Sequence, residues 1–318
     1  MNNSTLVSLS NVSKHYSKVR ALTSVDMELK HSEVLGLFGH NGAGKTTMMK
    51  LILGVVTPSQ GEINVLGMSP SDKSAWHMRT KVGYLPENVS FYEQLTGLEV
   101  LTYFAKLKGF TKAHAINLLE QVGISHAMKR AVKTYSKGMR QRLGLAQAFI
   151  GEPKLLLLDE PTVGLDPIAT AEFYQTVDQL KSQGTSVILC SHALPGVEQH
   201  IDRAMILSAG EVLAMGTLTE LRKSANLPVV IKPHGLNGAV RQDANWIKYF
   251  GEGNTDTSSI VDALHVPEEE KIPVLQYLLS LEGINDIDVE PANLDKVYQY
   301  YLAKNNQPES INKKEGNE

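Results

Sequence analysis

The stretch GHNGAGKTT, residues 39–47, combines glycines, a lysine and two threonines in a pattern suited to phosphate groups. Glycines let backbone N–H groups turn inward around an anion, and the positive end of a following helix attracts negative charge. At this spacing Lys45 reaches the β- and γ-phosphates of a nucleotide, and the Thr46 hydroxyl coordinates Mg²⁺. The predicted nucleotide-binding residues are Gly39, His40, Asn41, Gly42, Ala43, Gly44, Lys45, Thr46 and Thr47.

A second chemical stretch is LLLLDEPT, residues 155–162, in which an apolar run ends at two carboxylates. Asp159, at the end of a buried strand, is expected to hold the magnesium ion through water. Glu160 follows it, where a carboxylate can polarise an attacking water as a general base. Together the two stretches indicate nucleotide hydrolysis, a chemistry that many enzymes with such a loop share.

The stretch YSKGMRQRL, residues 135–143, predicts another anion site. Ser136 is a good N-cap, and the residues after it have a helical pattern. The helix start thus offers a hydroxyl, a flexible Gly138 and the cation of Lys137. One nucleotide cannot easily use two such sites in one chain, because the first loop already wraps the phosphates. A second copy of the protein could bring this site to it.

These residues must be positioned by strands and helices, and the pattern is that of an α/β fold. Segments 6–16 and 21–30 alternate apolar and polar residues, which favours half-buried antiparallel strands. The run 33–39 predicts a strand that leads through the glycine-rich loop into a helix at 45–54. The runs 154–161 and 185–192 lack polar alternation, as in parallel strands buried on both faces, with a helix at 169–184 between them.

Two further regions follow from the pattern. Residues 99–122 have helical spacing interrupted near Gly109, which indicates a helical insertion at about 88–150 in a first domain of residues 1–223. Residues 224–305 predict a small α+β domain, and 306–318 a disordered tail that is almost entirely polar. The small domain is either a regulatory or dimerising unit or a passive stabilising one, and the sequence does not decide between them.

Composition narrows the class of protein. The 318 residues are 42% hydrophobic and 20% charged, and the net charge of −3 gives no reason to expect nucleic acid as a partner. The single cysteine, Cys190, is expected to be a small core residue. The longest apolar run, at 155–158, is far short of the roughly 20 residues that span a bilayer. The chain is therefore expected to be cytoplasmic, with any membrane part supplied by another subunit.

With these motifs in this order, the chain resembles the ABC-transporter ATPase family. The resemblance implies a P-loop nucleotide-binding domain with a parallel core sheet, an antiparallel β subdomain and a helical subdomain. It also implies ATP and Mg²⁺ as cofactors. In this family a signature L-S-G-G-Q of one protomer caps the γ-phosphate bound by the other, so a homodimer is implied. Ser136 and Gly138 match the signature, whereas Tyr135, Lys137 and Met139 depart from it.

The resemblance assigns roles to residues that local patterns do not reveal. Tyr16 matches the aromatic residue that stacks on adenine, and His192 matches the switch histidine that contacts the γ-phosphate. Asp166, in TVGLDP, matches a loop that crosses the dimer interface. The segment 82–97 matches the loop that couples ATP to membrane subunits, with Glu87 where the family has glutamine. Thr46, Glu87 and Asp159 form the implied magnesium set, and Glu160, His192 and Lys45 the catalytic one.

Several segments, among them GYLPENVSFY and LCSHALPGVE, are similar in sequence to a group of ABC ATPase subunits. Those subunits serve maturation of the copper sites of nitrous oxide reductase in denitrification. That resemblance implies NosY-like permease subunits and a NosD-like periplasmic partner. It also implies a peripheral location on the cytoplasmic face of the inner membrane. An ATPase of a drug, lipid or ion exporter would share nearly every motif. A third hypothesis is that the chain is a soluble ABC protein with no role in transport.

Overall fold

The computed structural model describes residues 5–192, 194, 196–235, 249 and 263–306. The chain divides into two compact units, Met1–Met215 and Gly216–Glu318. The sequence placed this boundary after residue 223, but α7 (Leu218–Ser224) packs on α9 (Leu294–Asn306). The hydroxyl of Tyr301 in α9 donates to the carbonyl oxygen of Leu221 in α7 at 3.2 Å. Helix α7 therefore belongs to the second unit.

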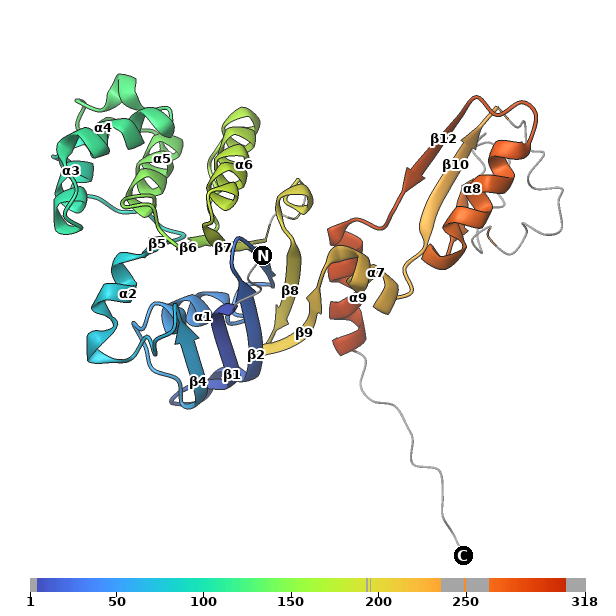
Figure 1. The fold of residues 1–318 in the computed structure, drawn as a ribbon, viewed down its shortest axis with the longest axis horizontal. Helices are drawn as coiled ribbons and strands as arrows, with labels where there is room; N and C mark the ends of the chain where they lie inside the picture. The colour runs from blue at the N-terminus through green and yellow to red at the C-terminus, as the bar shows by residue number, and fades with distance from the viewer. Residues whose placement is uncertain (1–4, 193, 195, 236–248, 250–262, 307–318) are drawn as a thin grey trace, which may run out of the picture. The chain divides into compact units, whose positions relative to one another are not determined.

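The first unit begins with a three-stranded antiparallel sheet in the order β2-β1-β4 (Figure 1). Its strands are β1 (Thr5–Tyr16), β2 (Val19–Lys30) and β4 (Gln60–Val65). Both β2 and β4 pair with β1 in antiparallel register. The alternation of apolar and polar residues at the start of the chain therefore arises as expected, from strands buried on one face.

A six-stranded sheet in the order β5-β6-β7-β3-β8-β9 forms the centre of the unit. Its strands are β3 (Val34–Phe38), β5 (Val82–Leu85), β6 (Leu155–Asp159), β7 (Ser186–Ser191), β8 (Arg203–Ser208) and β9 (Glu211–Gly216). Strands β5, β6, β7, β3 and β8 pair in parallel. All residues of β3, β6 and β7 are buried, which confirms the prediction from their continuous apolar runs.

The helices of this unit are α1 (Lys45–Ile52), α2 (Trp76–Thr80), α3 (Gly97–Leu107), α4 (Lys112–Gln121), α5 (Lys137–Ala148) and α6 (Pro167–Ser182). Short 3₁₀ turns lie at Lys73–Ala75, Ser125–Ala127, Val132–Thr134 and Glu198–His200. The break between α3 and α4 is at Gly109, whose φ of 84° is costly for other residues. Helices α3, α4 and α5 pack on one another and fall within the expected helical insertion (Figure 1).

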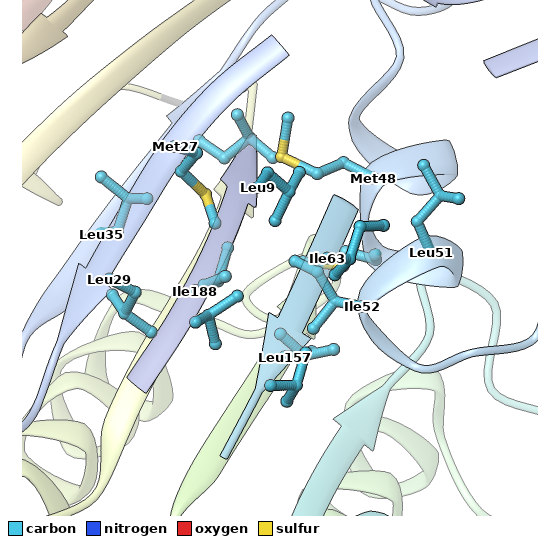
Figure 2. Packing of buried hydrophobic residues seen from close by; sticks show 14 of the residues in the cluster. Leu9, Met27, Leu29, Leu35, Met48, Leu51, Ile52, Ile63, Leu157 and Ile188 are labelled. Atoms are coloured by element: carbon cyan, nitrogen blue, oxygen red, sulfur yellow. The ribbon is translucent and has the colours of Figure 1, made fainter. Parts of the chain in front are cut away.

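A hydrophobic core joins the two sheets through α1 (Figure 2). Leu9 and Met27 come from the antiparallel sheet, Leu157 and Ile188 from the parallel one, and Met48 from α1. The thiol of Cys190 is fully buried in the same cluster, where burial raises its pKa well above the ordinary value. This agrees with the reading of Cys190 as a small core residue.

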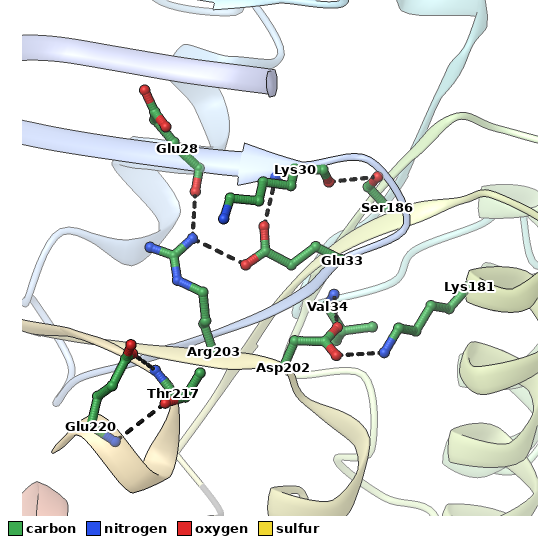
Figure 3. Close-up of polar contacts among 10 residues, drawn as sticks. All are labelled: Glu28, Lys30, Glu33, Val34, Lys181, Ser186, Asp202, Arg203, Thr217 and Glu220. Atoms are coloured by element: carbon green, nitrogen blue, oxygen red, sulfur yellow. Dashed lines mark hydrogen bonds and ion pairs between the residues drawn. The ribbon is translucent and has the colours of Figure 1, made fainter. Parts of the chain in front are cut away.

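Polar contacts fasten the amino ends of the parallel strands (Figure 3). Arg203, at the start of β8, donates to Oε1 of the buried Glu33 at 3.0 Å and to the carbonyl oxygen of Glu28 at 3.1 Å. Beside them, Asp202 accepts from the backbone N–H of Val34 at 2.8 Å. These contacts lie at the edge opposite to the predicted site residues, so they fix the sheet without entering the site.

The second unit contains a small antiparallel sheet in the order β11-β10-β12. Its strands are β10 (Val229–His234), β11 (Leu264–Val266) and β12 (Asp286–Glu290), and α8 (Lys271–Ser280) follows a 3₁₀ turn at Glu268–Glu270. Val274 and Leu278 of α8 pack on Ile231 and Leu264 of the sheet. These strands and helices have the α+β character that the sequence predicts for residues 224–305. The predicted disordered tail lies, beyond Asn306, outside the described residues.

Candidate functional site

The carboxyl ends of the parallel strands converge on one cavity of about 500 Å³. Strand β3 leads into the loop 39–44, β6 ends at Asp159, and β7 ends one residue before His192. In open parallel sheets this edge is the usual place for ligands. The predicted residues that line the cavity are Tyr16, His40, Asn41, Gly42, Ala43, Gly44, Lys45, Thr46, Thr47, Glu87, Asp159, Glu160 and His192.

The glycine-rich loop has the shape of an anion cradle. Gly42 and Gly44 have φ angles of 86° and 111°, in the left-handed region that glycine adopts without strain. A Cβ on Gly44 would lie 2.6 Å from the carbonyl oxygen of Ala21, whereas one on Gly42 would meet nothing within 4 Å. The close approach at Gly44 and the open space at Gly42 both fit a loop that wraps a phosphate chain.

Lys45 is buried, and its ammonium donates to backbone oxygens of this loop. Its Nζ donates to the carbonyl oxygen of Gly39 at 2.5 Å and to that of His40 at 3.2 Å. Gly39 does not line the cavity, and its part in the site is this contact. A buried cation is costly without a counter-charge, so the position of Lys45 beside the cavity fits an anionic ligand.

Two of the three predicted magnesium residues, Thr46 and Asp159, are in contact, and Glu87 lines the same cavity. The Thr46 hydroxyl donates to Oδ2 of Asp159 at 3.1 Å. Burial raises the pKa of the Asp159 carboxyl, the Thr46 hydrogen bond lowers it, and the charges of Glu160 and Glu87 raise it again. Tyr84 is also partly buried here, and its burial together with the charge of Asp159 raises its pKa to about 12. A divalent cation among these carboxylates would relieve their repulsion, so the donor set fits hard oxygen ligation of Mg²⁺.

Glu160 and His192 meet at the mouth of the cavity. Nδ1 of His192 lies 2.7 Å from Oε2 of Glu160, and the backbone N–H of His192 lies 3.3 Å from the same oxygen. Glu160 has a φ of 52° and donates its own N–H to the carbonyl oxygen of Cys190 at 3.0 Å. Its carboxylate is therefore aimed into the cavity by a backbone conformation that is unusual for a residue with a side chain.

Tyr16 lies at the outer rim of the cavity and is partly exposed. The ammonium of Lys14 stands 5.0 Å from the centre of its ring, within the range of a cation–π contact. Arg20 also lines this rim, and the sequence reading missed it. Its only signal was a cation four residues after Tyr16, in the next strand, which gives no spacing specific to a nucleotide.

The remaining predicted residues lie apart from this cavity. Ser136, Lys137, Gly138 and Asp166 line a second cavity of about 490 Å³ that shares no lining residue with the first. Ser136 caps α5 by accepting from the N–H of Met139 at 3.2 Å, and Asp166 caps α6 by accepting from that of Ala169 at 2.8 Å. One chain thus carries two separate sets of predicted ligand residues.

The departures from the family signature have structural reasons at two positions. Tyr135 is buried, and its hydroxyl donates to the carbonyl oxygen of Ala127 at 2.8 Å. The stem of Lys137 lies over Gly164, where a Cβ would come within 2.9 Å of the Lys137 Cδ atom. Sequence reasoning also missed Gln141, a buried residue of α5, because an isolated glutamine in a helix has no distinctive pattern.

Comparisons with known proteins show to which family the chain is similar. The family model described as ABC transporter matches residues 22–163. The chain is 33% identical over 291 residues to the uncharacterized ABC transporter ATP-binding protein YdbJ of Bacillus subtilis, covering 90% of this chain and 91% of that one. It is 35% identical over 222 residues to the bacitracin transport ATP-binding protein BcrA of Bacillus licheniformis, covering 69% and 72%.

Among solved structures, one described as the structure of the ATP binding subunit of an ABC transporter matches with a TM-score of 0.64 and 32% identity. The match covers 69% of this chain and 92% of that chain.

Proposed function

This chain belongs to the family of ABC transporter ATP-binding proteins, and we propose that two copies of it hydrolyse ATP to drive membrane subunits. The contact between Glu160 and His192 at the carboxyl edge of the sheet carries the proposal, because it sets a carboxylate and an imidazole beside the phosphate loop. ATP and Mg²⁺ are the cofactors of this family. The first unit has the P-loop fold of that family, with its parallel core and antiparallel sheet.

In the proposed site the residues divide the binding and the chemistry of ATP among them. The loop 39–47 holds the phosphates with its backbone N–H groups and the Lys45 ammonium. Thr46, Asp159 and Glu87 hold Mg²⁺, which when bound neutralises charge on the phosphate oxygens. Glu160 takes the proton of the attacking water, and His192, 2.7 Å away, holds the γ-phosphate and orients Glu160. Tyr16 stacks on the adenine at the rim.

A second protomer completes each site in this proposal. Ser136, Lys137, Gly138 and Asp166 cannot serve the ATP of their own chain, because they line a different cavity. Presented across a dimer, the N-cap hydroxyl of Ser136 and the start of α5 face the γ-phosphate bound by the partner. ATP then closes the dimer, and hydrolysis allows it to open.

A third cavity supports the proposed coupling to membrane subunits. It measures about 330 Å³ and is lined by Ser90, Phe91, Tyr92, Leu95, Val100, Tyr103 and Phe104. Tyr92 is 79% exposed and Tyr103 58%, which is unusual for aromatic side chains with no further role. The residues that line this cavity begin at Ser90, three positions after Glu87. A permease segment docked there would therefore respond to conformational changes in the loop 82–97.

The cargo has two candidates. The segments similar to ATPase subunits of nitrous oxide reductase maturation favour a role in assembling its copper sites. In that case the chain is a NosF-type subunit with NosY-like permease and NosD-like periplasmic partners. The second candidate is export of a drug, lipid or ion, which the similarity to the bacitracin transport ATP-binding protein BcrA favours.

The location follows from the partners. Within the part of the chain that the structure describes, no helix has both the length and the apolar character to cross a bilayer. We place the protein at the cytoplasmic face of the inner membrane, held there by its permease. Affinity purification of the full chain from solubilised membranes, with identification of the bound subunits, tests this. Recovery of a permease supports the proposal, and its type separates the two cargoes. Recovery without any membrane subunit contradicts it.

A further inference from the structure

Besides the residues proposed to face a partner, helix α5 carries the buried Gln141. Ser136 caps its first turn, and Gln141 follows further along the same rigid helix. Gln141 is 4% exposed, so its amide lies in the protein interior rather than on the face that holds Ser136. Buried side-chain amides in proteins are hydrogen-bonded. The hydrogen bonds of Gln141 therefore show which neighbouring segment it links to α5.

The partners of Gln141 belong to the catalytic loop of its own chain. Its Nε2 donates to the carbonyl oxygen of Pro161 at 3.1 Å and lies 3.5 Å from that of Glu160. Backbone carbonyls only accept, so the NH₂ group of the amide must face them. The N–H of Val163 approaches the Glu160 carbonyl at 3.3 Å, which is also long. Gln141 is therefore a principal polar support of this turn.

The turn needs support because Glu160 adopts a strained conformation. A φ of 52° is rarely populated by residues with side chains and persists only where the surroundings hold it. The direction of the Glu160 carboxylate depends on that backbone conformation. A small rotation of the Glu160–Pro161 peptide would move the carboxylate away from His192, which now lies 2.7 Å from it.

We propose that Gln141 is a positioning residue that couples the two ATP sites of the dimer. The proposal rests on the function proposed above, in which Ser136 contacts the ATP of the partner. When α5 seats on that ATP, Gln141 transmits the position of the helix to the Glu160–Pro161 peptide of its own site. Each protomer then aligns its general base only after its signature helix has engaged the partner's nucleotide.

A second contact between the same two segments supports this link. A Cβ on Gly138, in the first turn of α5, would lie 3.1 Å from the carbonyl oxygen of Gly164, in the loop that follows Glu160. The helix start and the catalytic loop thus touch at both Gly138 and Gln141.

The test compares the full chain with two Gln141 variants and one matched control. Gln141→Met keeps the length of the side chain and its helix propensity but removes the donor. Gln141→Glu keeps the size and replaces the NH₂ group by an acceptor. Gln147→Met makes the first change elsewhere on α5, at a residue outside the described site. ATPase rate is measured against ATP concentration, ATP affinity by equilibrium binding, and folding by thermal unfolding.

For the wild-type chain we expect a Hill coefficient of about 1.5–2, since the two sites act on each other. Both Gln141 variants should lower kcat about tenfold or more and bring the Hill coefficient to about 1, with ATP affinity kept. Gln147→Met should match the wild type. If Gln141→Glu unfolds because it buries a charge against carbonyl oxygens, Gln141→Met carries the test, because its side chain is neutral and of similar length.

Three results would overturn the proposal. One is a Gln141 variant that folds and keeps both kcat and the Hill coefficient, which is the outcome for a purely structural glutamine. Another is a wild-type Hill coefficient of about 1, since coupled sites would raise it. The third is a wild-type chain with no ATP hydrolysis and no ATP-dependent dimer, which would overturn the proposed function as well. The first two results leave that function intact.

Discussion

Nδ1 of His192 lies 2.7 Å from Oε2 of Glu160, although the two residues are 32 positions apart in the chain. The contact exists because β6 and β7 are neighbours in the parallel sheet, with Asp159 in register with Cys190. It joins the proposed general base to the proposed γ-phosphate contact. Both residues also line the cavity of the phosphate loop. The predictions below follow from this arrangement and from the contacts around it.

Glu160→Gln should bind ATP normally and lose hydrolysis by about 100-fold or more, because the amide cannot accept the proton of the attacking water. The variant should then accumulate as an ATP-bound closed dimer. Phosphate release assays and sedimentation with ATP measure the two effects. Glu120→Gln, an exposed change on α4, is the control. Normal hydrolysis by Glu160→Gln would refute the role of this carboxylate.

Glu87→Gln should change turnover and weaken Mg²⁺ binding. The charge of Glu87 raises the pKa of the Asp159 carboxyl, so the two carboxylates repel each other in the site and a bound cation relieves that repulsion. Without that charge we expect the half-saturating Mg²⁺ concentration to rise by about 2- to 10-fold, a change of up to about 1.4 kcal/mol. Titration of ATPase activity with Mg²⁺ measures it. An unchanged ATPase rate together with unchanged coupled transport would show that Glu87 has no tuning role.

Two substitutions of Lys137 separate its stem from its charge. The stem lies over Gly164, so Lys137→Met should keep this packing while Lys137→Gly loses it. If the ammonium contacts the partner's phosphate, both variants should weaken the ATP-bound dimer of a Glu160→Gln chain. If only packing matters, the glycine variant alone should do so. Sedimentation equilibrium distinguishes the cases. A dimer unaffected by either change would mean that Lys137 serves only the solvent-exposed surface.

Asp159→Asn should stabilise the chain in the absence of nucleotide. Burial raises the pKa of the Asp159 carboxyl, so over the pH range between its ordinary and raised values the folded chain binds more protons than the unfolded one. Stability therefore falls as the pH rises through that range, and the asparagine variant should lack this fall. We expect its Tm at neutral pH to rise by a few degrees, about 2–4 °C for each kcal/mol. The cost should be loss of the Tm increase on adding Mg²⁺ and ATP.

Arg203→Met should destabilise the first unit by about 3 kcal/mol, because it leaves the buried carboxylate of Glu33 without its charged partner. Lys181→Met breaks the ion pair with Asp202, which is more exposed than the Arg203–Glu33 pair. This change should lower the free energy of unfolding by less than about 1 kcal/mol. Both residues appear in Figure 3. Thermal unfolding measures the two changes. Equal effects would show that burial does not set the strength of these pairs.

The sequence alone was enough to predict the proposed ligand residues where they are contiguous in the chain. The loop 39–47 and the Asp159–Glu160 pair depend on backbone geometry within a few residues, so their spacing is enough to predict them. The antiparallel and parallel strands, the break near Gly109 and the helix capped by Ser136 followed from local patterns for the same reason.

Only the tertiary structure decided which distant residues meet. The order β5-β6-β7-β3-β8-β9 does not follow the chain, and it brings Glu87, Asp159 and His192 to one cavity. The boundary at Met215 depends on α7 packing on α9, a contact across about 80 residues of chain. The bond from Gln141 to Pro161 is also invisible in sequence, because a single amide acquires a role only from the groups that folding places around it.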